Sequence, residues 1–223
     1  MRAFAGGTAV ITGAASGIGM VLARRAARER MNLVLADIEL PRLQGAIAEL
    51  PCHPERVLAQ ACDVSVEADV AALAAQERES HVVNTASVAG LLSTPASAAY
   101  NVSKHGVVTL SETLYQELKA ENSRVGVSLL CPAWVKTGID QAGRNRQARY
   151  GEASPAGEMS RALEDRIAKA LESGRLSADD MADAVFAAVA EERFYVIPHR
   201  KILEVVKRRC EDIVEGRNPS PAG

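Results

Sequence analysis

The feature that most constrains the fold of this chain is a glycine-rich turn between an apolar run and a helix pattern. The turn reads Thr-Gly-Ala-Ala-Ser-Gly-Ile-Gly over residues 12–19, after the apolar run Thr8–Ile11 and before the amphipathic stretch Met20–Glu29. The apolar run predicts a buried strand, and strand–turn–helix is the context in which three glycines indicate a dinucleotide site. The sequence therefore predicts an α/β fold that begins with a nucleotide-binding unit.

Each glycine of this turn has an expected task. Gly13 allows a tight turn, Gly17 lets the main chain approach a pyrophosphate, and Gly19 lets the helix pack close to the strand. The N–H groups and the positive dipole end of the helix would then face the phosphates. We therefore expect Gly13, Ser16, Gly17, Ile18 and Gly19 to bind the cofactor, and the alternative is an ordinary glycine turn.

Strand and helix patterns alternate along the rest of the chain. The further strands are expected at 32–36, 57–62, 82–86, 125–131 and 194–198, and the further helices at 40–50, 66–78, 98–121, 158–172, 178–190 and 201–214. Ser177 is the expected cap of the helix at 178–190. Such alternation predicts a doubly wound parallel sheet with helices on both faces, in which ligands bind at the carboxyl ends of the strands. We expect residues 1–223 to form a single domain.

Composition excludes several classes of function. The 223 residues are 48% hydrophobic and carry a formal net charge of −2, which gives no electrostatic argument for binding nucleic acid or an acidic membrane surface. No apolar run reaches the length of a membrane span and no signal-peptide core is present, so a cytoplasmic protein is expected. The cysteines and histidines show no metal-ligand spacing, so we expect no metal site and buried free thiols.

Two aspartates end expected strands and are candidate cofactor ligands. Asp37 follows Gly19 by 18 positions, where a carboxylate can accept hydrogen bonds from ribose hydroxyls and repels a 2′-phosphate. No Arg or Lys lies between Gly13 and Gly19 or directly after Asp37, so NAD is favoured over NADP. The Asp63 carboxylate could contact the adenine amino group. A capping or solvated role stays open for Asp37, and a helix N-cap role for Asp63.

A tyrosine and a lysine share one face of the expected helix 98–121. Tyr100 and Lys104 are four positions apart, and a phenol, with a reference pKa of about 10, needs a nearby cation to act as a base at neutral pH. With that help, Tyr100 can serve as general acid–base for a hydroxyl–carbonyl interconversion. Ser87, at the end of the preceding strand, can hold the carbonyl oxygen. A Tyr-x-x-x-Lys pair on its own is more often a surface pair.

Together these motifs resemble the short-chain dehydrogenase/reductase family, and they occur in family order. They are TGAASGIG (12–19), Asp37, DV (63–64), NTASVAG (84–90), YNVSK (100–104) and CPAWVKT (131–137). The resemblance implies that Ser87, Tyr100 and Lys104 are catalytic and that the cofactor also contacts Val64, Pro132, Val135, Thr137, Tyr100 and Lys104. The Val135 backbone and the Thr137 hydroxyl would hold the nicotinamide carboxamide. Ala133 stands where the family usually has glycine.

The resemblance also implies an activity and an assembly. The expected reaction is hydride transfer between NAD and a small-molecule secondary alcohol or ketone, without nucleic-acid or membrane partners. The expected assembly is a homodimer or homotetramer, and residues 138–176 would include the substrate lid. The arginines at 144, 146 and 149 fall in that segment, and a solvated loop is the simpler interpretation of them.

The chain departs from the family by an absence. Only 23 residues separate Asp63 from Ser87, so about fifty residues are missing, the size of one strand–helix unit. The lost unit would contain the Asn-Asn-Ala-Gly strand end and the helix whose asparagine anchors the proton relay. Asn84 belongs to the strand that leads to Ser87 and does not replace them. The sheet must then close up or leave strand edges unpaired.

Two functions follow from this departure. The first is an active NAD-dependent oxidoreductase. The second is a shortened family member that binds nucleotide or oligomerises without turnover, because catalysis tolerates misplacement of much less than one strand spacing of about 4.8 Å. The sequence is compatible with a natural short form and with a deletion.

Overall fold

A computed structural model describes residues 4–73, 80–135, 137, 151 and 176–221 of the chain. The chain divides into two compact units, and each is considered by itself. Unit 1 consists of residues 1–78, 136–152 and 177–183, and unit 2 of residues 79–135, 153–176 and 184–223. The expected helix at 158–172 lies outside the described residues. So does the expected lid at 138–176, apart from Gly151 and Leu176.

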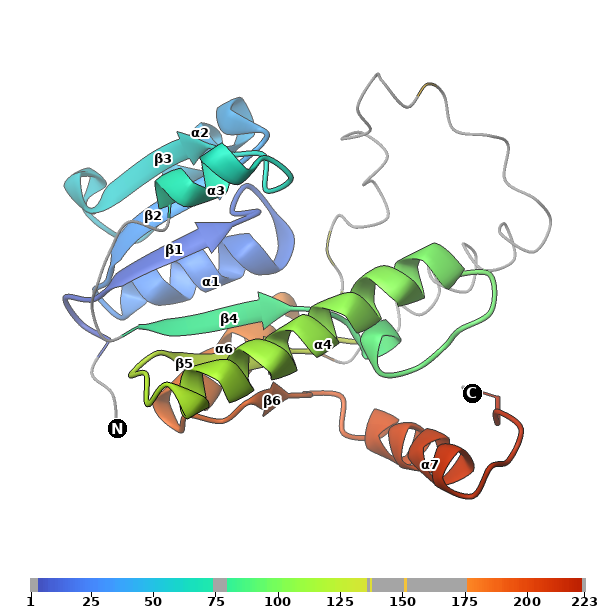
Figure 1. Cartoon of the computed structure of the whole chain (residues 1–223). Helices are drawn as coiled ribbons and strands as arrows, with labels where there is room; N and C mark the ends of the chain where they lie inside the picture. The colour runs from blue at the N-terminus through green and yellow to red at the C-terminus, as the bar shows by residue number, and fades with distance from the viewer. Residues whose placement is uncertain (1–3, 74–79, 136, 138–150, 152–175, 222–223) are drawn as a thin grey trace. The chain divides into compact units, whose positions relative to one another are not determined.

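Unit 1 is a three-stranded parallel sheet with helices between its strands (Figure 1). Its strand order is β1-β2-β3, with Val10 opposite Val34 and Leu35 opposite Ala59. Helix α1 packs on β1 and β2, and α2 packs on β2 and β3. The elements are β1 (Thr8–Thr12), α1 (Gly17–Arg28), β2 (Asn32–Asp37), α2 (Leu40–Ile47), η1 (Pro54–Arg56), β3 (Val57–Ala61) and α3 (Glu67–Leu73).

Unit 2 contains a second three-stranded parallel sheet, of order β4-β5-β6. The long helix α4 packs on β4 and β5 and on the short turn η2 that follows β4 (Figure 1). The elements of this part are β4 (His81–Thr85), η2 (Val88–Gly90), α4 (Ala98–Ala120), β5 (Gly126–Leu130), β6 (Tyr195–Val196) and α7 (Ile202–Val214).

Helix α6 (Ala178–Ala190) begins where the sequence predicts its cap. The Ser177 hydroxyl accepts a hydrogen bond from the backbone N–H of Asp180 at 3.2 Å, and the Asp180 carboxylate accepts one from the Ser177 N–H at 2.7 Å. This reciprocal arrangement satisfies two N–H groups at the start of the helix. The expected cap is confirmed.

The core of each sheet lies around one strand. In unit 1, Leu33, Leu35 and Ala36 of β2 are fully buried, and in unit 2 so are Leu129 and Leu130 of β5. Central parallel strands are covered by helices on both faces, which explains these nearly continuous apolar runs. Every strand pair in the described residues is parallel, as the sequence predicts.

The strands beside the missing segment are less covered. In the described residues β1 and β4 each have one hydrogen-bonded strand neighbour, β2 and β5 respectively. Val10 in the middle of β1 is 48% exposed, and no residue of β4 is fully buried. The prediction that Thr8–Ile11 forms a strand is confirmed, but the prediction that this strand is buried is wrong. Its apolar pattern suits a strand with two neighbours, and the described chain supplies one.

None of the helices in the described part of the chain combines the length and the apolar character needed to cross a membrane. Over the same residues, no three His, Cys, Asp or Glu side chains come together as a metal site would require.

Candidate functional site

The glycine turn of unit 1 has the backbone that the sequence requires. Gly13 has φ +64°, a left-handed conformation that favours glycine. A Cβ on Gly19 would lie 2.2 Å from the Gly13 carbonyl oxygen, so only glycine lets α1 approach the turn this closely. Ser16 is the N-cap residue of α1, and within the described structure its side chain makes no capping hydrogen bond. The first turn of α1 therefore has the N–H groups that could face a phosphate.

Asp37 is fixed against this turn by two hydrogen bonds. One carboxylate oxygen accepts from the Ala15 N–H at 2.9 Å, and the other accepts from the Glu39 N–H at 3.0 Å. The first bond ties the end of β2 to the glycine turn, 22 positions away in sequence. A carboxylate held beside the phosphate-binding turn can accept from a ribose and disfavours further negative charge there.

Asp63 is held in the turn between β3 and α3 by hydrogen bonds with Ser65 and Asp69. Its carboxylate accepts hydrogen bonds from the Ser65 N–H at 2.9 Å and from the Ser65 hydroxyl at 2.7 Å, and its own N–H donates to Asp69 at 2.9 Å. These bonds shape the turn that leads to α3. Val64 beside it is 64% exposed. The contact of Asp63 and Val64 with adenine stays a prediction.

Thr137 lies against the glycine turn within unit 1. A Cβ on Gly17 would come 3.4 Å from the Thr137 Cβ, which is ordinary van der Waals contact. The structure thus places the threonine expected to hold the carboxamide next to a glycine expected to bind the pyrophosphate.

In unit 2, Ser87 stands one residue further from its strand than the sequence predicts. Strand β4 ends at Thr85, and Ser87 is the N-cap of η2. Its hydroxyl accepts from the Ala89 N–H at 3.2 Å and donates to the Pro132 carbonyl at 3.4 Å. Ser87 is buried, so these two backbone partners hold it in place, and the longer bond to Pro132 is the one that a substrate oxygen could replace.

Tyr100 and Lys104 share a face of α4, as expected. The Lys104 Nζ lies 5.7 Å from the centroid of the Tyr100 ring and donates to the Thr85 carbonyl at 3.5 Å. Burial lowers the pKa of Lys104 from its ordinary value. The Tyr100 side chain is 42% exposed, so its hydroxyl can be reached from outside. The pair has the proximity that an ammonium needs to stabilise a phenolate.

Asn101 is a supporting residue that the sequence analysis missed. It is buried, its side-chain N–H donates to the Thr94 carbonyl at 2.9 Å, and its side-chain oxygen accepts from the Thr94 hydroxyl at 3.2 Å. These bonds fasten the loop before α4 next to Tyr100. Asn84, in contrast, donates to the Ser111 hydroxyl at 2.9 Å on α4, which agrees with its assignment to β4 rather than to the relay.

The segment after β5 adds a second missed residue. The Ala133 N–H donates to Nδ1 of His199 at 3.2 Å, so this nitrogen carries no proton and the neutral ring carries its hydrogen on Nε2. Nε2 is buried and has no hydrogen-bond partner among the described residues. Burial lowers the pKa of His199, against the opposing effect of a hydrogen bond with the Trp134 backbone. A lone histidine far along the chain gives no sequence signal for this role.

The same segment holds the other residues expected near the nicotinamide. The Pro132 carbonyl accepts from the Val88 N–H at 3.0 Å, and Val135 is buried. Cys131, where β5 ends, is fully buried, and burial raises the pKa of its thiol to about 11. The structure thus brings Ser87 and Pro132 together, and Tyr100 and Lys104 together, within unit 2.

A family model described as short chain dehydrogenase matches residues 7–81 and 72–148, more than half of the chain. The chain belongs to the short-chain dehydrogenase family. A "CLA biosynthesis dehydrogenase/reductase" of Lactiplantibacillus plantarum is 25% identical over 277 positions, with 98% of this chain and 97% of the relative covered. A "1-deoxy-11-beta-hydroxypentalenate dehydrogenase" of Streptomyces avermitilis is 27% identical over 85% of this chain and 83% of the relative. The chain is an oxidoreductase of this family.

Solved structures agree with the family. A short-chain dehydrogenase/reductase from Burkholderia phymatum, solved in complex with NAD, is 36% identical with a TM-score of 0.92, over 99% of this chain and 98% of that one. A variant of the actinorhodin polyketide ketoreductase with NADPH is 23% identical with a TM-score of 0.63, over 89% of this chain and 97% of that one, and shares the fold. The Rossmann-like parallel α/β fold is confirmed, and a nicotinamide nucleotide is its cofactor.

The comparisons also show where the missing segment would lie. The alignment to the L. plantarum relative spans 277 positions and this chain has 223 residues, so at least 54 positions, the difference, have no residue here. The two stretches that match the family model meet at residues 72–81, between α3 and β4. Both the number of missing positions and their place in the chain therefore support the predicted loss of a central strand–helix unit.

The half-buried His199 predicts how stability depends on pH. Its pKa is lowered on folding, so between that lowered value and about 6.5 the unfolded chain binds a proton that the folded chain does not. The contribution of His199 is therefore complete above pH about 6.5 and is lost as the pH falls. In this window it steepens the curve of unfolding free energy against pH by at most about 1.4 kcal/mol per pH unit, the value for one proton.

We expect His199→Gln, whose amide oxygen can still accept from Ala133, to flatten this curve between pH 7 and 5. Urea unfolding at several pH values measures the effect. His53, whose side chain is 69% exposed, offers the matched control His53→Gln for the loss of an imidazole. Parallel curves for the native chain and His199→Gln would contradict the assignment.

Proposed function

We propose that this chain transfers a hydride between NAD and a small-molecule secondary alcohol or ketone, with Tyr100 as the acid–base. The observation that carries the proposal is the Tyr100–Lys104 pair on α4, with Nζ 5.7 Å from the centroid of the ring. In the same unit, the Ser87 hydroxyl is anchored to the Pro132 carbonyl at 3.4 Å. These residues form the chemical half of the family's motif set, and the glycine turn with Asp37 forms the nucleotide half.

The residues divide the reaction between them. Ser87 would donate its hydroxyl hydrogen to the carbonyl oxygen of the substrate in place of Pro132. Tyr100 would pass a proton to that oxygen during reduction and take it back during oxidation. Lys104, already next to the ring, would stabilise negative charge on the Tyr100 oxygen. The bound nicotinamide would supply or accept the hydride.

Asp37 supports NAD rather than NADP as the cofactor. Both of its oxygens are held by backbone N–H groups, one of Ala15 in the glycine turn and one of Glu39 after β2, so the carboxylate cannot easily turn away from a ribose bound there. Its charge would repel a 2′-phosphate, and no Arg or Lys follows directly to compensate. The 36% identical B. phymatum structure is described with NAD.

A second candidate function is nucleotide binding without turnover. The observation that favours it is the central segment missing near residues 72–81, because the family's central strand and its relay helix belong there. If its absence displaces Ser87 and Tyr100 from the bound nicotinamide by even about 1 Å, the rate would fall by orders of magnitude.

Assembly and location extend the proposal. We propose a homodimer or homotetramer, and the support is the outer face of α4, where Val102 is 73% and Leu110 is 65% exposed. A lid within 138–176 and a cytoplasmic location stay predictions.

The cofactor preference is tested by Asp37→Ala. Loss of charge-assisted bonds to the ribose, worth about 1.5–3 kcal/mol, should weaken NAD about 10- to 100-fold and bring the affinities for NAD and NADP closer together. Calorimetric titration of both nucleotides measures this. Glu39→Ala, two residues on at a carboxylate that pairs with Arg42, is the matched control and should bind NAD as the native chain does. Tighter binding of NADP than NAD by the native chain would contradict the proposal.

The catalytic role is tested by Tyr100→Phe. We expect NADH formation on a panel of secondary alcohols to fall by about 10²- to 10⁴-fold, the contribution of a general acid–base, with NAD affinity unchanged within about threefold. Tyr115→Phe, further along the same helix where the ring packs on Phe194, should keep the native rate. Equal turnover by Tyr100→Phe and the native chain would remove Tyr100 from the mechanism. If the native chain binds NAD and turns over no alcohol or ketone of the panel, the second candidate function replaces the first.

A further inference from the structure

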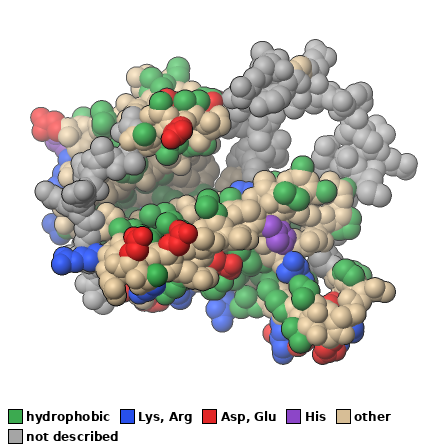
Figure 2. Space-filling view, in the orientation of Figure 1, with side chains coloured by type: hydrophobic (Ala, Val, Ile, Leu, Met, Phe, Trp, Pro, Cys, Tyr) green, Lys and Arg blue, Asp and Glu red, His purple; other side chains and the backbone are tan. Residues whose placement is uncertain are grey.

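A cavity in unit 2 is lined by none of the residues assigned above to the reaction. It lies between α4, the strand β6 with the loop after it, and α7, and its volume is about 710 Å³. We call it the α4–α7 cavity. Figure 2 shows histidine, basic and apolar side chains gathered on the surface between α4 and α7. The volume falls within the range of about 300–1,000 Å³ that is usual for small-molecule sites.

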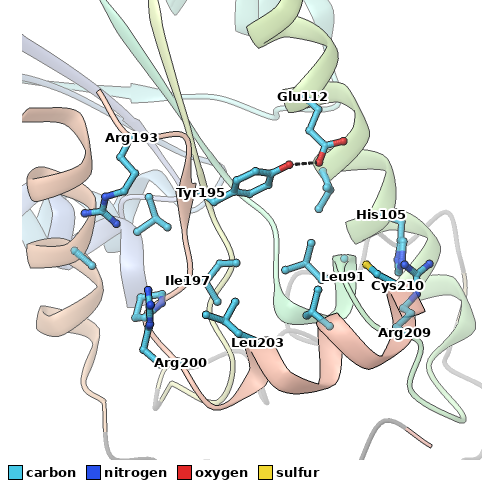
Figure 3. A pocket seen from close by; sticks show the side chains of 16 residues that line it. Leu91, His105, Glu112, Arg193, Tyr195, Ile197, Arg200, Leu203, Arg209 and Cys210 are labelled. Carbon is cyan, nitrogen blue, oxygen red and sulfur yellow. Dashed lines mark hydrogen bonds between the residues drawn. The ribbon is translucent and has the colours of Figure 1, made fainter. Parts of the chain in front are cut away.

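The middle of the α4–α7 cavity is apolar. Leu91 follows η2, Ile197 follows β6, and Leu203 lies in the first turn of α7, and in Figure 3 these three side chains converge on the open space. Val108 of α4 and Val206 of α7 extend the same surface. An apolar skeleton placed here would be removed from water, which favours binding.

The charged groups around this surface are mostly positive. Of the described lining residues, three are arginines and one is an acid. Arg193 pairs with Glu191 at 3.0 Å, whereas Arg200 and Arg209 have no carboxylate partner in the described chain. In Figure 3, Arg209 lies beside His105 at one end of the cavity and Arg200 lies at the other. Two guanidinium groups are therefore available to an anion.

The acidic side chain among the described lining residues is engaged elsewhere. Glu112 accepts a hydrogen bond from the Tyr195 hydroxyl at 2.6 Å, drawn as a dashed line in Figure 3. Burial, and to a lesser extent the hydrogen bond with Glu112, raises the pKa of Tyr195 to about 12. The hydroxyl therefore keeps its hydrogen, and with it the hydrogen bond to Glu112, at physiological pH. Glu112 thus stays bound to Tyr195 and does not pair with the arginines.

We propose that the α4–α7 cavity binds a small amphipathic acid, with its apolar skeleton on Leu91, Ile197 and Leu203 and its anionic group on Arg209 or Arg200. The site is separate from Ser87, Tyr100 and Lys104, and the inference does not depend on the proposed dehydrogenase activity. Occupation would nevertheless touch the same turn of α4 as the catalytic lysine, because His105 lines the cavity directly after Lys104.

The test is calorimetric titration of the full chain with decanoate, and with decanamide as the uncharged match. We expect saturable binding of decanoate and at least tenfold weaker binding of decanamide. Arg209→Gln and Arg200→Gln together should weaken decanoate at least tenfold. Lys207→Gln is the matched control, because Lys207 is exposed on α7, pairs with Glu211 at 3.8 Å and does not line the cavity. It should bind decanoate as the native chain does.

Three controls keep the outcome clear. Circular dichroism and NAD titration of the double arginine variant show that it is folded. Tyr100→Phe should bind decanoate with native affinity, because the acid does not occupy the catalytic site. Sedimentation should give the same oligomeric state for the double variant and the native chain. The proposal would be overturned if the native chain does not bind decanoate, or if Tyr100→Phe loses that binding. It would also be overturned if the double arginine variant binds decanoate as tightly as the native chain, or if its oligomeric state differs from that of the native chain.

Discussion

The parallel sheet is what this structure depends on, and the described chain forms it as two three-stranded sheets, β1-β2-β3 and β4-β5-β6. A parallel strand is stable when both of its edges are paired and both of its faces are covered, which is why such strands are rich in Val, Ile and Leu. Strand β1 retains that composition, yet Val10 is 48% exposed and one strand pairs with β1 in the described residues. The family comparisons place the missing positions at residues 72–81, beside β4. Other departures from the sequence expectations are small by comparison.

The nucleotide half and the chemical half of the proposed site are each held by contacts within one unit. In unit 1, the Ala15 N–H donates to the Asp37 carboxylate at 2.9 Å, and Thr137 lies against Gly17. In unit 2, Ser87 is anchored to the Pro132 carbonyl and Lys104 to the Thr85 carbonyl. Each half is held by contacts within its own unit, so each survives the missing strand. Function requires that one dinucleotide engage both.

Local patterns predicted most of the secondary structure and the residues of each half. The glycine turn, the cap at Ser177 and the Tyr100–Lys104 spacing are all encoded within a few neighbouring residues, and all three are found as expected. Pairing and burial depend on residues far away in sequence, which is why the exposure of β1 was not predicted. The bond from Ala133 to His199 joins positions 66 apart, and no periodicity or motif connects them. Asn101 could have been suspected as a polar residue on the inner side of the first turn of α4.

The most direct test of the central claim uses the chain's single tryptophan. Trp134 is 44% exposed and lies in unit 2 between Pro132 and Thr137, the segment expected to hold the nicotinamide, whereas Asp37 and the glycine turn lie in unit 1. We would titrate the chain with NAD and with ADP-ribose, which lacks the nicotinamide, and follow the emission of Trp134. If one dinucleotide engages both units, NAD quenches Trp134 saturably, and ADP-ribose competes with NAD without quenching. If NAD binds by calorimetry and leaves Trp134 unchanged, or changes it no more than ADP-ribose does, the nicotinamide does not reach the catalytic half and the account is wrong.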